Sequence, residues 1–187
     1  MSGTKRSVLA MSLALLASCA DKYLDNQAAE QGNEVDRVPV GELHRPGQRC
    51  VTCHREDGQS SDHPFALGGT VFAQPNRQVG VNGVEVLLTD SDGSKFIAKT
   101  NCVGNFFVKT TDWTPHFPII VDIQKNGVRR SMQTPIGREG DCGACHKTFV
   151  SDPLSQMPHI YLFATDEPGL PDGDPACPVD PVRPGTK

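Results

Sequence analysis

Residues 68–136 show the clearest hydrophobic pattern of the chain, an alternation of apolar and polar positions with a period of two. Such alternation is typical of β-strands that bury one face and expose the other. We predict short strands at 70–73, 84–89, 95–99, 106–108, 119–124 and 128–133. Several short strands with regular turns predict a mainly β fold, an antiparallel β-sandwich.

Turn signals separate these predicted strands. Asp92-Gly93 stands between the strands at 84–89 and 95–99, and Asn126-Gly127 stands before the last strand. Asn-Gly is the strongest signal for a two-residue hairpin, because both positions readily adopt positive φ angles. Asp90-Ser91-Asp92-Gly93 contains residue types that bind calcium but lacks the spacing of an EF-hand loop, so we interpret it as a plain turn.

The segments that flank the sandwich are rich in polar residues, glycine and proline, and contain little repeating pattern. Such composition favours turns over long helices. An apolar run at 160–163 is the exception and predicts one last strand. We divide the chain into six parts. They are a targeting segment at 1–18, a flexible tether at 19–43, a first loop-rich attachment segment at 44–67, the sandwich at 68–136, a second attachment segment at 137–163 and a proline-rich tail at 164–187.

Two stretches place cysteine and histidine at the same spacing, Cys50-Val51-Thr52-Cys53-His54 and Cys142-Gly143-Ala144-Cys145-His146. The pattern C-x-x-C-H is the attachment signature of a c-type haem. Two thiols add to the two vinyl groups of one haem, and the histidine after the second cysteine gives its nitrogen to the iron. We therefore predict two molecules of haem c, attached through Cys50, Cys53, Cys142 and Cys145, with His54 and His146 as axial ligands of the iron.

Two other uses of paired cysteines can be weighed against haem. A zinc ribbon separates its two C-x-x-C pairs by about 15–20 residues, whereas about 88 residues separate Cys53 from Cys142. A thioredoxin-type redox pair lies near a βαβ pattern, whereas Cys50 follows a polar, turn-forming stretch. A shared zinc site would need the fold to bring the two pairs together, and covalent haem remains the favoured interpretation.

The second axial position of each iron has several candidates in the sequence. The remaining histidines and two methionines can all serve, namely His44, His63, His116, His159, Met132 and Met157. For any one of them, a surface histidine or a packing methionine is the alternative. We favour His63 and His159 as distal ligands, because each follows its motif closely in a flexible segment.

The N-terminus has the features of a bacterial export signal, with two basic residues before an apolar stretch at 8–17 that is too short to span a bilayer. Leu16-Ala17-Ser18-Cys19 resembles the lipobox of bacterial lipoproteins. The resemblance implies cleavage before Cys19 and lipidation of its thiol. Because Ala20 rather than aspartate follows, it also implies the outer membrane as the destination. The alternative is an ordinary secretory signal that is cleaved nearby.

Charge and cysteine count add two expectations. The formal net charge is −4, and removal of the signal takes away two cations and no acid, so the exported chain is more acidic still. An acidic surface argues against nucleic acid as a partner. Of the seven cysteines, Cys102 and Cys177 are left after haem attachment and lipidation. In an oxidising compartment the two can form a disulfide, and two unpaired thiols are the alternative.

The order of short motifs within 68–136 resembles a known family. Gly68-Gly69-Thr70-Val71-Phe72 comes first, then the strand from Gly83 to Asp90, then Lys99-Thr100-Asn101 and Gly104-Asn105-Phe106. This order is similar to the carboxypeptidase regulatory-like, or transthyretin-like, sandwich, which has an immunoglobulin-like architecture. With a C-x-x-C-H motif on each side, the stretch 50–146 resembles bacterial di-haem proteins built on such a domain. The resemblance implies a non-catalytic scaffold, and Cys102 departs from the small polar residue usual at its position.

Three classes of function are compatible with these features. The leading hypothesis is a di-haem electron carrier, held to the envelope membrane by a lipid and exchanging electrons with other envelope redox proteins. The second is a small peroxidase-like di-haem enzyme, which needs an open iron position and an acid/base residue above it. The third is a β-sandwich binding module with ancillary haems. For a carrier we expect both motifs at the same end of the sandwich, because electrons must pass between the irons.

Overall fold

The computed structural model describes residues 22–33, 38, 40–146, 157–164 and 176–178. The predicted signal at 1–18, Cys19 and most of the tail at 164–187 lie outside these residues. The elements are α2 (Lys22–Glu30), α3 (Cys50–Cys53), β1 (Phe65–Phe72), β2 (Glu85–Thr89), β3 (Lys95–Lys99), β4 (Asn105–Lys109), β5 (Ile120–Lys125), β6 (Val128–Ser131), the 3-10 helix η1 (Cys142–Ala144) and β7 (Ile160–Tyr161).

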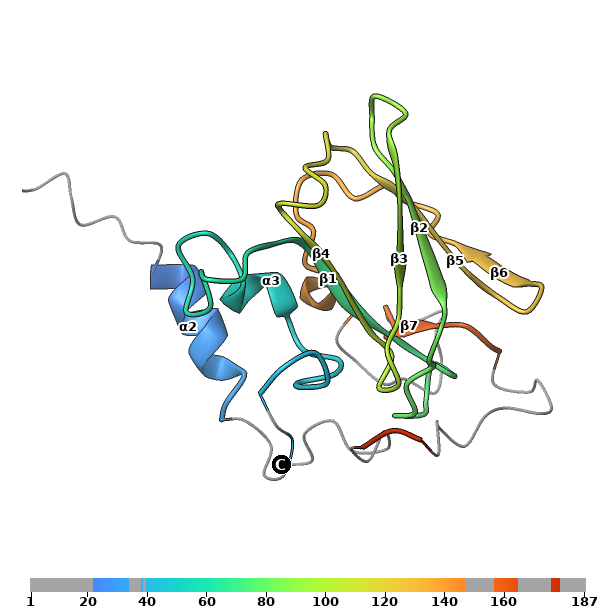
Figure 1. Cartoon of the computed structure of the whole chain (residues 1–187), viewed down its shortest axis with the longest axis horizontal. Coiled ribbons are helices and arrows are strands. Elements are labelled where there is room, and N and C mark those ends of the chain that lie inside the picture. The colour runs from blue at the N-terminus through green and yellow to red at the C-terminus, as the bar shows by residue number, and fades with distance from the viewer. Residues whose placement is uncertain (1–21, 34–37, 39, 147–156, 165–175, 179–187) are drawn as a thin grey trace, which may run out of the picture.

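The strands form two sheets, one of three strands in the order β4-β1-β7 and one of four strands in the order β3-β2-β5-β6 (Figure 1). The prediction of a mainly β fold with two sheets is confirmed. All strand pairs are antiparallel except β1 and β7, which run parallel, so the first sheet is mixed. Each of these two strands follows one C-x-x-C-H motif.

A single core lies between the sheets and explains the alternating pattern. Val86 and Leu88 of β2 are buried there with side chains from the other sheet, such as Leu67 and Phe106. The alternate positions point outward, and Ile97 on the neighbouring strand β3 is 56% exposed. The predicted inward and outward faces are therefore confirmed for β2 and β3.

The hairpin predicted at Asn126-Gly127 is present. Asn126 and Gly127 have φ angles of 49° and 83°, and they join β5 to β6 with Lys125 opposite Val128. Positive φ at both central positions is the geometry that Asn-Gly favours, because it matches the twist of the flanking strands.

Residues 22–33 differ from the predicted flexible tether. Helix α2 packs against α3, and the Gln31 side chain beyond its end bonds to the backbone of Arg49 in both directions, at 2.7 and 3.2 Å. Arg55 adds a 2.5 Å contact to Asp25 on the helix. A nine-residue polar helix is marginal alone, so these contacts with the first motif hold it in place. Among the described residues, no helix has the length and apolar character that crossing a bilayer requires.

Candidate functional site

Both C-x-x-C-H motifs pack against the middle of β1, where two consecutive glycines make room for them. A Cβ at Gly68 would lie 2.8 Å from Cβ of Cys50, and a Cβ at Gly69 would lie 2.8 Å from Cβ of Cys142. Side chains of consecutive strand residues point to opposite faces. The two motifs therefore approach β1 from its two faces. The sequence predicts a strand that begins after Gly69, but β1 begins at Phe65 and the glycines lie inside it.

The two motifs also contact each other directly. Asp141, the residue before the second motif, accepts hydrogen bonds through Oδ2 from the backbone amide and the hydroxyl of Thr52, at 2.9 and 2.8 Å. A Cβ at Gly143 would lie 2.7 Å from the carbonyl oxygen of Gln48. We expected both motifs at the same end of the sandwich; the structure places them next to each other, but at the middle of β1 rather than at an end. Burial raises the pKa of Asp141 above its usual value, although the Thr52 donors oppose this effect.

The histidines of the two motifs are oriented in the same way. Nδ1 of His54 lies 2.8 Å from the backbone oxygen of His63, and Nδ1 of His146 lies 2.8 Å from the backbone oxygen of Pro158. A carbonyl oxygen only accepts, so each Nδ1 donates its proton and the lone pair is left on Nε2. Histidines that bind metals have this arrangement, in which the second nitrogen fixes the ring and its tautomer.

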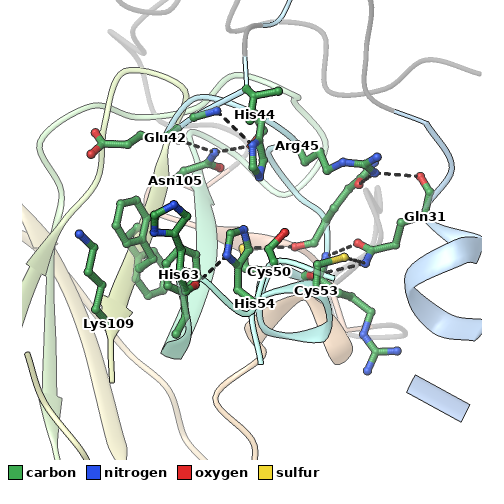
Figure 2. A pocket seen from close by; sticks show the side chains of 18 residues that line it. Gln31, Glu42, His44, Arg45, Cys50, Cys53, His54, His63, Asn105 and Lys109 are labelled. Atoms are coloured by element: carbon green, nitrogen blue, oxygen red, sulfur yellow. Dashed lines mark hydrogen bonds between the residues drawn. The ribbon is translucent and has the colours of Figure 1, made fainter. Parts of the chain in front are cut away.

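The first motif borders a cavity of about 450 Å³, which Figure 2 shows. Cys50, Cys53 and His54 line it together with the rings of Phe65 and Phe107. The Phe65 ring stacks on His54 with centroids 4.1 Å apart, and Phe107 stacks on Phe65 at 4.7 Å. Burial, and the nearby His44, lower the pKa of His54. The imidazole is therefore neutral at pH 7, which is the form that binds a metal.

The burial and arrangement of the motif cysteines argue against two other uses of paired cysteines. Burial and the charge of Asp141 raise the pKa of the Cys50 thiol, and raise that of Cys142 to about 12. A dithiol redox pair needs the opposite shift, because the thiolate is the reactive form. A shared zinc needs four converging ligands. Within the described part of the chain, no three His, Cys, Asp or Glu side chains gather as a metal site.

The structure separates the two predicted distal ligands. His63 is exposed, and its backbone carbonyl already holds Nδ1 of His54. His159 is buried at 4% exposure, with its ring edge-on to Phe72 at 4.9 Å. Burial and the nearby His146 lower the pKa of His159 to about 4. His159 therefore lies near the second motif as a neutral ring, and its role as a ligand stays a prediction.

The histidine ring that lies near the ring of His54 belongs to His44 instead. The two ring centroids are 5.9 Å apart and the ring planes differ by 20°. His44 is among the candidates in the sequence, but the sequence favours His63 because it follows the motif closely. Of the other candidates, His116 bonds to Asp92 in the turn between β2 and β3, at 2.6 Å, and Met157 is 53% exposed.

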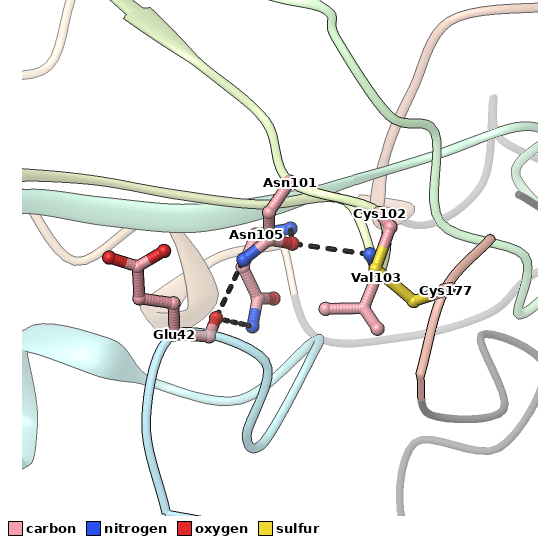
Figure 3. The surroundings of a disulfide bond; sticks show 6 residues. All are labelled: Glu42, Asn101, Cys102, Val103, Asn105 and Cys177. Atoms are coloured by element: carbon pink, nitrogen blue, oxygen red, sulfur yellow. Dashed lines mark hydrogen bonds between the residues drawn. A yellow bond between two sulfur atoms is a disulfide. The ribbon is translucent and has the colours of Figure 1, made fainter.

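Asn105 at the start of β4 and Asn101 in the turn before it hold the loop that carries His44, as Figures 2 and 3 show. The Asn105 side chain donates to the carbonyl oxygens of His44 and Glu42, at 2.8 and 3.2 Å. Asn101 donates to the same Glu42 oxygen at 2.7 Å. Thr70 of β1 completes the network, because its hydroxyl accepts from the Gly47 amide and donates to Asn105, both at 2.7 Å. The sequence showed these asparagines only as residues of a turn.

A disulfide lies beside this network. Cys102 and Cys177 are bonded, with Cα atoms 5.5 Å apart and a sequence separation of 75 (Figure 3). Of the two alternatives left open by the cysteine count, the structure has the paired one. The bond ties a residue of the tail to the turn between β3 and β4.

Comparison of the chain with protein-family models, with curated protein sequences and with solved structures gave no significant match.

Proposed function

We propose that this chain is an electron-transfer protein of the cell envelope with two covalently attached c-type haems. Cys50 and Cys53 attach the first haem, Cys142 and Cys145 attach the second, and His54 and His146 each give Nε2 to an iron. The observation that carries the proposal is the common orientation of the two histidines, each with Nδ1 bonded to a backbone carbonyl at 2.8 Å. The haems supply one-electron redox chemistry when bound.

The chain's own residues position and shield these groups. Gly68 and Gly69 let both motifs approach β1, and the Thr52–Asp141 hydrogen bonds fix one motif against the other. The rings of Phe65 and Phe107 exclude water from one side of His54. In this proposal the two-sheet domain is a transthyretin-like scaffold without chemistry of its own. The contact between the motifs supports electron exchange between the two sites.

The proposed location follows from the lipobox-like sequence before Cys19. Cleavage and lipidation there hold the protein on the envelope membrane, with the outer membrane as the destination implied by Ala20. Partners are then other redox proteins of the envelope. The acidic net charge is consistent with protein partners rather than nucleic acid.

Haem counting tests the proposal directly. The full chain is expressed in a bacterium that attaches c-type haem, and haem per chain is measured by pyridine haemochrome and by intact mass. We expect two haems in the wild type and one in Cys53→Ala or Cys145→Ala. Cys102→Ser is the matched control and keeps two, because that cysteine lies in the disulfide. A wild-type protein with no haem, or with one, contradicts the proposal.

A further inference from the structure

We infer that His44 is the second axial ligand of the iron that His54 binds, so that the first haem iron has a histidine on each side. This inference rests on the proposed function. It goes beyond it by naming a ligand that the C-x-x-C-H motif does not contain. It also assigns a chemistry to the first site. An iron with both axial positions filled transfers electrons and has no open position for a substrate.

The spacing of the two rings carries the argument. His54 and Phe65 are in direct stacking contact, with centroids 4.1 Å apart, whereas His44 and His54 are nearly parallel at 5.9 Å. The His44 and His54 rings are therefore less closely packed than those of His54 and Phe65. An imidazole–metal bond is about 2 Å long and a ring nitrogen lies about 1 Å from its centroid, so two imidazoles on opposite sides of a metal have centroids about 6 Å apart. The observed separation matches this value.

The ring nitrogens are arranged consistently. Nδ1 of His54 is bonded to the His63 carbonyl, which leaves Nε2 for the iron. Nδ1 of His44 lies 3.4 Å from the amide of Gly41, so Nε2 is again the nitrogen that remains to bind. Binding through Nε2 puts the ring proton of His44 on Nδ1 and removes that hydrogen bond. The loss is small because a bond of 3.4 Å is weak.

The position of His44 is fixed by strands rather than by a loose loop. Asn105 of β4 holds the His44 carbonyl at 2.8 Å, and Thr70 of β1 holds Asn105. Side chains that orient a metal ligand from outside the coordination sphere are a general feature of metal sites. His44 and His54 both line the cavity beside Cys50 and Cys53, and Figure 2 shows the His44 ring above the His54 ring in that view.

The competing candidate His63 also lines this cavity, but its contact with His54 is made by its backbone. Its carbonyl lies at Nδ1, the edge of the ring opposite the nitrogen that would bind iron, and its side chain is exposed. Two histidine ligands leave no vacant position for peroxide or for carbon monoxide. The first haem would therefore transfer electrons and would not act as a peroxidase.

The test uses the purified full chain with both haems, as wild type, His44→Ala, His44→Met and the control His63→Ala. The number of haems per chain is counted first, and is two in all four proteins. Ferric EPR then measures the low-spin and high-spin fractions, and the ferrous carbon monoxide difference spectrum measures open iron positions. Redox titration follows the potential of the first haem.

In the wild type we expect a low-spin first haem that does not bind carbon monoxide. His44→Ala gains one high-spin haem and one carbon monoxide site per chain. His44→Met returns to low spin with a higher potential, because a methionine ligand raises haem potential. His63→Ala resembles the wild type. These changes would not follow from a merely structural role of His44.

Three outcomes overturn the inference. One is a His44→Ala protein with two haems and unchanged spectra. Another is a His63→Ala protein that gains the high-spin haem instead. The third is a wild-type first haem that binds carbon monoxide. Each leaves the proposed function standing, whereas a wild type without haem removes the proposed function itself.

Discussion

The backbone amide and the hydroxyl of Thr52 both donate to one oxygen of Asp141, across 89 positions of sequence. Each residue belongs to a different C-x-x-C-H segment, so a single carboxylate joins the two. The Asp141 side chain is 1% exposed, and Nε of Arg49 lies 3.9 Å from the same oxygen. A buried carboxylate with these donors makes the relative position of the two segments depend on one residue.

We expect Asp141→Ala to lower the free energy of unfolding by about 1–3 kcal/mol, because it leaves the buried Thr52 donors without an acceptor. Denaturant titration of the haem-loaded protein, followed by circular dichroism, measures this loss. Glu139→Ala is the matched control, since that half-exposed carboxylate also lies near Arg49, at 3.5 Å. An exposed ion pair contributes about 0–1 kcal/mol. Equal losses in the two variants would contradict the stated role of Asp141.

The two glycines of β1 give a second prediction. Gly68→Ala and Gly69→Ala each place a methyl group 2.8 Å from a Cβ of a motif cysteine, Cys50 or Cys142. Overpacking of this kind costs about 1–3 kcal/mol, and we expect that loss in the free energy of unfolding. Gly137→Ala is the control, because no atom lies within 4 Å of its added Cβ. If all three variants unfold at the same denaturant concentration, the motifs do not pack on β1 as described.

The turn between β2 and β3 gives a prediction of pH dependence. Asp90 accepts hydrogen bonds from the backbone amides of Asp92, Ser94 and His116, at 3.0, 2.8 and 3.3 Å. Burial raises the pKa of Asp90, but these donors outweigh it and the pKa lies below its usual value. In the unfolded chain the Asp90 carboxyl has a pKa of about 3.9. As the pH falls, the unfolded chain therefore takes up this proton at a higher pH than the folded chain does. The stabilisation by Asp90 is therefore present above about pH 4 and is lost as the pH falls through the folded pKa.

We expect Asp90→Asn to lower the thermal midpoint at pH 7, and the difference from the wild type to shrink below about pH 4. Thermal unfolding followed by circular dichroism from neutral to acidic pH measures both effects. Asp62→Asn, at an exposed position before β1, is the control. A difference for Asp90→Asn that stays constant over the whole pH range would show that the charge of Asp90 does not stabilise the turn.

The disulfide gives a fourth prediction. Closing a loop with a sequence separation of 75 removes much of the freedom of the unfolded chain. We expect Cys102→Ser, Cys177→Ser and the double variant each to lower the free energy of unfolding by about 2–4 kcal/mol. The single and double losses should agree, because one bond is removed in every case. Thiol labelling of the unreduced, denatured wild type should detect neither cysteine, and labelling of both would contradict the pairing.

The strands were predictable because their pattern is local. Val86 and Leu88 alternate with polar neighbours, and Asn126-Gly127 marks its hairpin without reference to any other part of the chain. The C-x-x-C-H motifs were found for the same reason, since the chemistry fixes the spacing within five residues. The apolar run at 160–163 also predicted β7, although not its parallel pairing with β1.

Other features depend on residues far apart in sequence. Gly68 and Gly69 were interpreted as the residues before a strand, because their use becomes apparent only when Cys50 and Cys142 lie against them. Helix α2 has too few apolar residues for a clear pattern, and contacts such as that of Gln31 with Arg49 hold it in place. The sequence favours His63 over His44 as the distal ligand, because closeness to the motif along the chain is its only guide. Pairing of β1 with β4 brings Asn101 and Asn105 to the loop that carries His44, and these asparagines position His44.

The bond between Thr52 and Asp141 also bears on the order of events during synthesis. A chain emerges from the ribosome with its N-terminus first, and the first motif appears 89 positions before its partner. The edge strand β7 comes later still, at Ile160–Tyr161. During this interval Cys50 and Cys53 cannot yet be enclosed by the second segment. If haem is attached as we propose, the attaching enzyme can reach the first motif before the second segment packs against it through Asp141.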